Sequence, residues 1–290
     1  MVERGATVQP TKVEKERIVE LVRLTKSLFV ERIPNEFIED MAFVGNSSGI
    51  YPWEPAKLVD LDVCLFVRQK DIATGQWLAD VRDELKLRIA ELDADFDCRI
   101  IVGPYKPSLE ELERPFIFVH LAVFLESEYK NASRLLRWAW RKYECLVRKD
   151  RLNALAPPHV SKDDVVAKVF TQLEMIERGE TTMREWLLPT FAAATIEITA
   201  DNPNFAEVCF SSVATCMRHH ARALGRAEAD ALENREFFHW YTNNIAPSEA
   251  LAELAVLKER TRNEGFGAMR VRSRVLAITC LRELAANLAI

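Results

Sequence analysis

The chain has 290 residues, 49% of them hydrophobic and 29% charged, which is an ordinary balance for a globular protein with a sizeable core. The net charge of −5 argues against long nucleic acid as the main ligand, because proteins that grip it usually present a basic surface. The first residues lack the apolar stretch of a secretory signal, and no apolar run reaches the roughly 18 residues of a membrane span. We therefore expect a cytoplasmic protein outside the membrane, whose six cysteines are free and buried.

The first part of the chain mixes helical and strand patterns. Apolar side chains recur at helical spacing after Thr11, which is placed to cap a helix. Short apolar runs bounded by turn residues predict buried strands. The predicted order is helix, strand, strand, helix, strand, strand, over residues 12–32, 41–44, 58–67, 77–92, 96–102 and 116–125.

From about residue 127 onward, helical spacing dominates and strand-like alternation almost disappears. The predicted helices cover residues 131–147, 163–178, 182–200, 205–224, 227–244 and 248–288. The fold class that follows is α+β. We expect an α/β domain over residues 1–127 and a mostly α-helical domain over residues 128–290.

Two aspartates interrupt the most apolar predicted strand. Asp60 and Asp62 are two residues apart, so both side chains point to one face of a strand. Two carboxylates on one face of a buried strand repel each other and are costly to desolvate. A divalent cation relieves both problems, and Mg²⁺ commonly takes one or two carboxylates together with phosphate oxygens. The pair therefore predicts a magnesium site, and the alternative is an edge strand with two solvated aspartates.

The turn before this strand is rich in groups that bind phosphate. Gly45 lets the backbone approach a ligand closely, and Ser47 and Ser48 add hydroxyl donors. Backbone amides and hydroxyls in such a turn can cradle phosphate oxygens. The same residues also make a good tight turn with no ligand at all. The position of the turn just before the acid pair is what supports a role in phosphate binding.

Together, residues 44–48 (Val-Gly-Asn-Ser-Ser) and 58–63 (Leu-Val-Asp-Leu-Asp-Val) resemble the motif of the nucleotidyltransferase superfamily, which includes DNA polymerase beta and the aminoglycoside nucleotidyltransferases. The resemblance covers residues 40–125, less than half of the chain. It implies a mixed sheet of nucleotidyltransferase type and two Mg²⁺ ions held by three carboxylates. Asn46 departs from the motif, in which glycine or serine is usual at this position.

The resemblance also implies a third carboxylate, from a later strand beside the acid pair. Asp97, at the start of a predicted strand, is the first choice, with Asp95 close behind. In a competing arrangement, the strand over residues 116–124 takes the third position. That strand offers His120 and no acid, which would imply altered or lost catalysis.

The activity implied by the resemblance is transfer of a nucleoside monophosphate from a nucleoside triphosphate to a hydroxyl of a small molecule such as an aminoglycoside. AMP is the nucleoside monophosphate that we expect. Pyrophosphate is released, and antibiotic resistance would follow. The three aspartates would be the catalytic metal ligands, the glycine–serine turn would bind the triphosphate, and the helical domain would supply the acceptor pocket. A tRNA or a protein side chain as acceptor, and an inactive nucleotide-binding scaffold, are the alternatives.

Other conspicuous residues have simpler interpretations. His219 and His220 are adjacent, and neighbouring side chains of a helix point about 100° apart, which does not suit a metal pair. They are expected on a polar helix face. The basic and aromatic stretch over residues 134–143 predicts either a triphosphate groove or a helix that bridges the domains.

Overall fold

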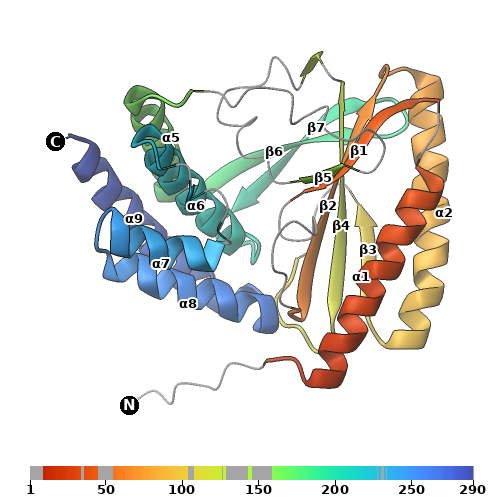
Figure 1. The fold of residues 1–290 in the computed structure, drawn as a ribbon, viewed down its shortest axis with the longest axis horizontal. Coiled ribbons are helices and arrows are strands. Elements are labelled where there is room, and N and C mark those ends of the chain that lie inside the picture. The colour runs from red at the N-terminus through yellow and green to blue at the C-terminus, as the bar shows by residue number, and fades with distance from the viewer. Residues whose placement is uncertain are drawn as a thin grey trace.

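The protein folds as a mixed sheet with two helices on one side and a larger group of helices on the other, as seen in a computed structural model (Figure 1). The structure describes residues 9–33, 36–44, 55–103, 108–125, 127–128, 143–145, 159–226, 228–229, 232 and 234–289. The elements are α1 (Lys12–Arg32), β1 (Ile38–Val44), β2 (Leu58–Val67), α2 (Ile72–Phe96), β3 (Arg99–Gly103), β4 (Phe116–Leu125), β5 (Tyr143–Cys145), α5 (Lys162–Arg178), β6 (Glu180–Leu187), β7 (Ala192–Thr199), α6 (Phe205–Ala223), α7 (Asn234–Asn244), α8 (Glu249–Glu264), η3 (Gly267–Met269) and α9 (Arg270–Ala289).

The sheet has the strand order β3-β4-β2-β1-β5, which places β2 at its centre. β2 pairs with β4 in parallel and with β1 antiparallel, so the sheet is mixed. Such a parallel pairing needs a long connection between the strands. Here α2 leads from β2 to β3, and β4 then inserts between them. The strand order therefore does not follow the order along the chain.

One face of the sheet is covered by α1 and α2. α1 begins with a capping box, in which the Glu14 N–H donates to Thr11 Oγ1 at 3.2 Å and the Thr11 N–H donates to the Glu14 carboxylate at 2.8 Å. Its buried side chains, including Ile18 and Phe29, pack against the odd-numbered residues of β2, such as Leu61, in one apolar cluster. Burial on this face excludes water from half of the central strand.

The C-terminal helices pack against the opposite face, at the end of the sheet where β2 and β4 begin. Leu58, Phe116 and Phe118 belong to the same apolar cluster as helices α5 to α9. The turn between α8 and η3 continues this contact, since the Phe266 N–H donates to the Leu109 carbonyl at 2.9 Å. The sheet therefore lies between two apolar clusters, and the cluster on this face contains residues of both halves of the chain.

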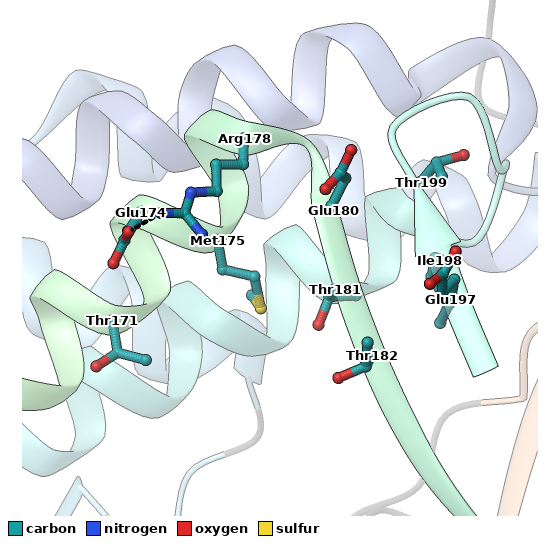
Figure 2. Close-up of a pocket in the computed structure, with 10 residues that line it drawn as sticks. All are labelled: Thr171, Glu174, Met175, Arg178, Glu180, Thr181, Thr182, Glu197, Ile198 and Thr199. Atoms are coloured by element: carbon teal, nitrogen blue, oxygen red, sulfur yellow. Dashed lines mark hydrogen bonds and ion pairs between the residues drawn. The ribbon is translucent and has the colours of Figure 1, made fainter. Parts of the chain in front are cut away.

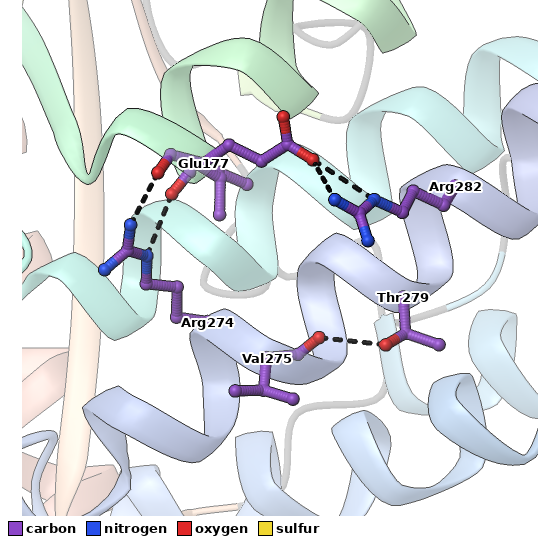
Figure 3. Close-up of polar contacts among 6 residues, drawn as sticks. Glu177, Arg274, Val275, Thr279 and Arg282 are labelled. Atoms are coloured by element: carbon purple, nitrogen blue, oxygen red, sulfur yellow. Dashed lines mark hydrogen bonds and ion pairs between the residues drawn. The ribbon is translucent and has the colours of Figure 1, made fainter.

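The end of α5 is held by α9 (Figure 3). Arg274 donates to the carbonyl oxygens of Ile176 and Glu177 at 2.9 and 2.6 Å, and Arg282 donates to the Glu177 carboxylate at 2.7 Å. The last carbonyls of a helix lack partners within the helix. Arg274 provides one for the Glu177 carbonyl and a second one for the Ile176 carbonyl, which also accepts from the Gly179 N–H at 3.1 Å. These bonds fix the point at which the chain turns from α5 into β6.

The prediction of a helix over residues 182–200 is wrong, because this segment forms the β6–β7 hairpin. Its β-branched residues Thr195, Ile196 and Ile198 favour a strand, and Pro189 at the tip cannot continue a helix. The hairpin reaches from α5 to the first turn of α2 (Figure 1). At that contact, a Cβ added to Gly75 would lie 1.7 Å from the Pro189 carbonyl oxygen.

Several other predictions can be compared with the structure. The strands over residues 58–67 and 116–125 and the helix over residues 12–32 are confirmed at their predicted bounds. The helix predicted over residues 248–288 is divided at Gly265, whose φ of 90° is in the left-handed region. Of residues 131–147, predicted as a helix, only 143–145 are described, and they form β5.

The broader expectations about fold class, cysteines and membrane spans can also be compared with the structure. The α+β class with a mixed sheet is confirmed, and the described residues from 159 onward are mainly helical apart from the hairpin. Five cysteines are free and buried, as expected: Cys64, Cys98, Cys209, Cys216 and Cys280. No helix within the described residues is long and apolar enough to cross a membrane.

We expect Gly75→Ala to lower stability by about 1–3 kcal/mol, the usual cost of overpacking, because the hairpin tip must move away from α2. Alanine favours a helix interior by about 1 kcal/mol over glycine, so α2 itself does not cause the loss. Denaturant unfolding measures the effect, with Gln76→Ala at the exposed neighbouring position as the control. A Gly75→Ala protein as stable as the wild type would contradict the close contact.

His219 generates a prediction about acid stability. The side chain is fully buried in α6, and burial, followed by the charges of Lys168 and Arg222, lowers its pKa to about 4. In the unfolded chain, the His219 imidazole binds its proton with a pKa near 6.5. The stability that depends on His219 being neutral is therefore complete above that pH and is lost as the pH falls towards 4. Between pH 7.5 and 5 the loss amounts to about 2 kcal/mol.

The measurement is the unfolding free energy at pH 7.5 and at pH 5. His219→Gln is expected to lose less stability between these pH values than the wild type. His239→Gln, a change at an exposed histidine of α7, is the control and should follow the wild type. Equal pH dependence in the wild type and His219→Gln would show that His219 does not titrate as its burial requires.

Candidate functional site

Asp60 and Asp62 lie side by side on one face of the central strand. Both side chains are half-buried, whereas Leu61 and Val63, which point to the opposite face, are fully buried. One carboxylate oxygen of Asp60, Oδ1, is itself buried. The strand therefore separates an apolar face, covered by α1 and α2, from a face that carries two acids.

His120 joins the two aspartates on this face. The register of β2 and β4 pairs Asp62 with His120 and Asp60 with Phe118. The His120 Nδ1 atom lies 3.3 Å from Asp62 Oδ1, and its ring stacks on the Phe118 ring at 6.1 Å between centroids. The strand beside the acid pair is thus the strand of residues 116–125, as in the competing arrangement, and it presents an imidazole there.

The neighbouring thiol responds to this environment. Burial, and then the negative charge of Asp62, raise the pKa of Cys64 well above its usual value. With its pKa raised, Cys64 stays a neutral thiol at physiological pH. Only the thiolate form of cysteine acts as a nucleophile or metal ligand, so Cys64 supplies neither function here. The chemistry available on this face comes from the two carboxylates and the imidazole.

Asp97 occupies a different kind of position from the one expected. It is not the first residue of a strand but the residue that ends α2, in a left-handed conformation with a φ of 50°. Its side chain is 80% exposed, and its Oδ1 lies 3.3 Å from the Arg114 guanidinium. Asp95, the second choice, lies within α2. The helical pattern of α2 continues four residues further than predicted, which removes both acids from the sheet.

The strand register also separates Asp97 from the acid pair. Arg99 is level with Phe116, which in turn is level with Leu58. Asp97 precedes Arg99 by two residues and β3 is two strands away from β2. Arg99 itself therefore lies about 7 Å along the strands and about 10 Å across them from Asp60, and Asp97 precedes it outside the strand. The structure does not bring Asp97 to the site.

The predicted phosphate turn lies outside the described residues, which include none of Gly45, Ser47 and Ser48. The basic and aromatic stretch over residues 134–143 also lies outside them, except for its last residue. The structure does show where the turn starts. Val44, the last residue of β1, pairs with Asp62, so the chain enters the glycine–serine turn from a point level with the acid pair.

The donor chemistry of this face suits a hard divalent cation. Carboxylate oxygens are the ligands that Mg²⁺ prefers, and one or two of them are sufficient when phosphate oxygens and water complete the shell. Within the described part of the chain, no group of three or more His, Cys, Asp or Glu side chains is placed to hold a metal ion. Asp60 and Asp62 could therefore anchor such an ion but not surround it.

Sequence reasoning identified the acid pair, and it placed His120 beside that pair only in the competing arrangement. The signal was present, since His120 is a polar residue in the middle of an apolar strand. What was missing was the strand order. No protein-family model matches this chain, and comparison with curated proteins and with solved structures finds no significant match. The resemblance to nucleotidyltransferases therefore rests on the motif residues.

We expect Asp97→Gly to raise the unfolding free energy by about 0.5–1 kcal/mol, because glycine adopts the left-handed helix end without strain. The exposed ion pair with Arg114 contributes little that could be lost. Mn²⁺ binding, followed by electron paramagnetic resonance, should be unchanged. Loss of Mn²⁺ binding in Asp97→Gly, with the fold intact, would return Asp97 to the metal site.

Proposed function

We propose that this chain is a metal-dependent nucleotidyltransferase, which moves a nucleoside monophosphate from a nucleoside triphosphate to a hydroxyl of a small molecule. The preferred nucleoside monophosphate is AMP. One observation carries the proposal: Asp60 and Asp62 share a half-buried face of the central strand β2. The mixed sheet with β2 at its centre and helices on both sides is consistent with a nucleotidyltransferase-type layout. The entry to the glycine–serine turn beside Asp62 adds to this support.

The two aspartates would hold the magnesium ion through their carboxylate oxygens. The ion would supply Lewis-acid polarisation of the phosphoryl group and a template that aligns the acceptor hydroxyl with it. His120 contributes by contact with Asp62 Oδ1, which limits the orientations of that carboxylate. The apolar face of β2 contributes rigidity, because its buried side chains fix the strand from which both acids project.

The net charge of the chain bears on the acceptor. At −5, the protein repels a polyanion at long range and attracts a cation. A cationic small molecule such as an aminoglycoside therefore fits better than a tRNA. The helical C-terminal half, which shares a core with the sheet, would carry the acceptor pocket.

A second candidate function is that of a nucleotide-binding scaffold without catalytic activity. Two observations favour it: β4 presents His120 beside the acid pair, and Asp97 lies elsewhere. A site with two carboxylates can bind a metal–nucleotide complex without the third acid that the resemblance implies for catalysis.

The test is incubation with each α-labelled nucleoside triphosphate, Mg²⁺ or Mn²⁺, and either a panel of aminoglycosides or tRNA. We expect label from ATP on an aminoglycoside, reduced about a thousandfold by Asp60→Asn or Asp62→Asn, because metal anchoring is worth several kcal/mol. Asp80→Asn, at an exposed position of α2, is the control of equal charge change.

The outcomes separate the candidates. Transfer that survives both active-site changes would overturn the proposal. Nucleotide binding that depends on Asp60 and Asp62, with no transfer to any acceptor, would establish the scaffold. Transfer to tRNA would keep the chemistry and replace the acceptor.

A further inference from the structure

The separation between His120 and Asp62 can be compared with two kinds of contact. The His120 Nδ1 atom lies 3.3 Å from Asp62 Oδ1. Hydrogen bonds between a charged nitrogen donor and a carboxylate are shorter, about 2.7–2.9 Å. Two donor atoms bound at right angles to one ion, each at about 2.1 Å, are about 3.0 Å apart. The observed separation is therefore closer to that of two ligands of one metal ion than to that of a charged hydrogen bond.

Two neighbouring strands hold these two donors in place. The parallel register of β2 and β4 makes Asp62 level with His120. The His120 ring stacks on the buried Phe118 ring, with 6.1 Å between centroids and 14° between planes, so its orientation is fixed. Solvent still reaches both donors, because the side chains of His120 and Asp62 are 31% and 43% exposed. The pair is thus preorganised and open to an ion from solution.

The imidazole makes this donor set selective among metal ions. Mg²⁺ is a hard cation that takes oxygen ligands. Mn²⁺ also takes carboxylate and phosphate oxygens, but as a first-row transition-metal ion it binds imidazole nitrogen as well. Within the described part of the chain, no three His, Cys, Asp or Glu side chains converge to hold an ion. Asp62 and His120 are therefore the direct ligands that the geometry supports, and Asp60 adds negative charge beside them.

We propose that this face binds Mn²⁺ in preference to Mg²⁺, with Asp62 Oδ1 and His120 Nδ1 as direct ligands. The ion takes the place of the hydrogen between these two atoms, and the neutral imidazole carries its hydrogen on Nε2. Water or phosphate oxygens fill the remaining positions. The inference rests on the metal site of the proposed function but not on nucleotidyl transfer, because an inactive nucleotide-binding scaffold would hold the ion in the same way.

A groove elsewhere on the molecule provides a control for cations that are attracted by charge alone. Where α5 faces β6 and β7, the groove is lined by Glu174, Glu180 and Glu197 (Figure 2). Glu174 forms an ion pair with Arg178. None of the residues drawn there is a histidine, so Mn²⁺ held by them would have oxygen ligands only. Coordination by nitrogen therefore distinguishes the proposed site from this groove.

The test is pulsed electron paramagnetic resonance of Mn²⁺ added to an excess of the full chain, so that only the tightest site is filled. We expect coupling of the Mn²⁺ electron spin to a ¹⁴N nucleus in the wild type, and its replacement by ¹⁵N coupling when histidine is ¹⁵N-labelled. His120→Asn should abolish the coupling. His239→Asn, at an exposed histidine of α7, and Glu180→Gln/Glu197→Gln, in the groove, are the controls and should retain it.

Titration calorimetry measures the preference between the two ions. His120→Asn should weaken Mn²⁺ binding about tenfold, because Mn²⁺ loses a ligand. Mg²⁺ binding should change by no more than about twofold, because Mg²⁺ takes oxygen ligands. His120→Asp, which supplies a third carboxylate, should instead raise the affinity for Mg²⁺.

The wild type alone can overturn the proposal, whatever the variants do. Mn²⁺ bound without nitrogen coupling, or no bound Mn²⁺ at all, would do so. Coupling that persists in His120→Asn, with the fold verified by circular dichroism, would also overturn it. Nucleotide transfer that depends on Asp60 and Asp62 would still stand if Mn²⁺ were bound through oxygen ligands alone, so the two proposals can fail separately.

Discussion

The structure depends on β2, a central strand whose two faces have opposite chemistry. Its odd-numbered side chains, such as Leu61 and Val63, are fully buried under α1 and α2. Its even-numbered positions include Asp60 and Asp62, and an apolar cover over them would leave two carboxylates in a low-dielectric interior. The C-terminal helices share a cluster with Leu58 on this face and with Phe118, which is level with Asp60, and the two acids stay half-buried.

Local patterns were sufficient for the elements that carry the acid pair. β2 and β4 are runs of apolar and β-branched residues, and their bounds can be predicted to the residue. The common direction of Asp60 and Asp62 follows from the two-residue period of any strand, so it needs no tertiary information. α1 could be predicted for a similar reason, because its capping residue Thr11 and its apolar spacing both lie within the segment.

Features that depend on distant segments could not be predicted in this way. The insertion of β4 between β2 and β3 places His120 beside Asp62, and no spacing in the sequence encodes that order. The hairpin was predicted as a helix from its local pattern, yet its tip is stabilised by packing against α2, which is distant in the sequence.

β4 presents His120 and not an acid beside Asp62, so the proposed metal site has two carboxylates where the resemblance implies three. Two carboxylates carry two negative charges, which balance one divalent ion. The three carboxylates implied by the resemblance would carry three and could share two ions. In this chain a second ion would therefore depend on oxygens of the bound triphosphate, which are good Mg²⁺ ligands. The nucleotide would then bring part of the metal site with it, and metal binding by the free protein would be weaker than binding of the metal–nucleotide complex.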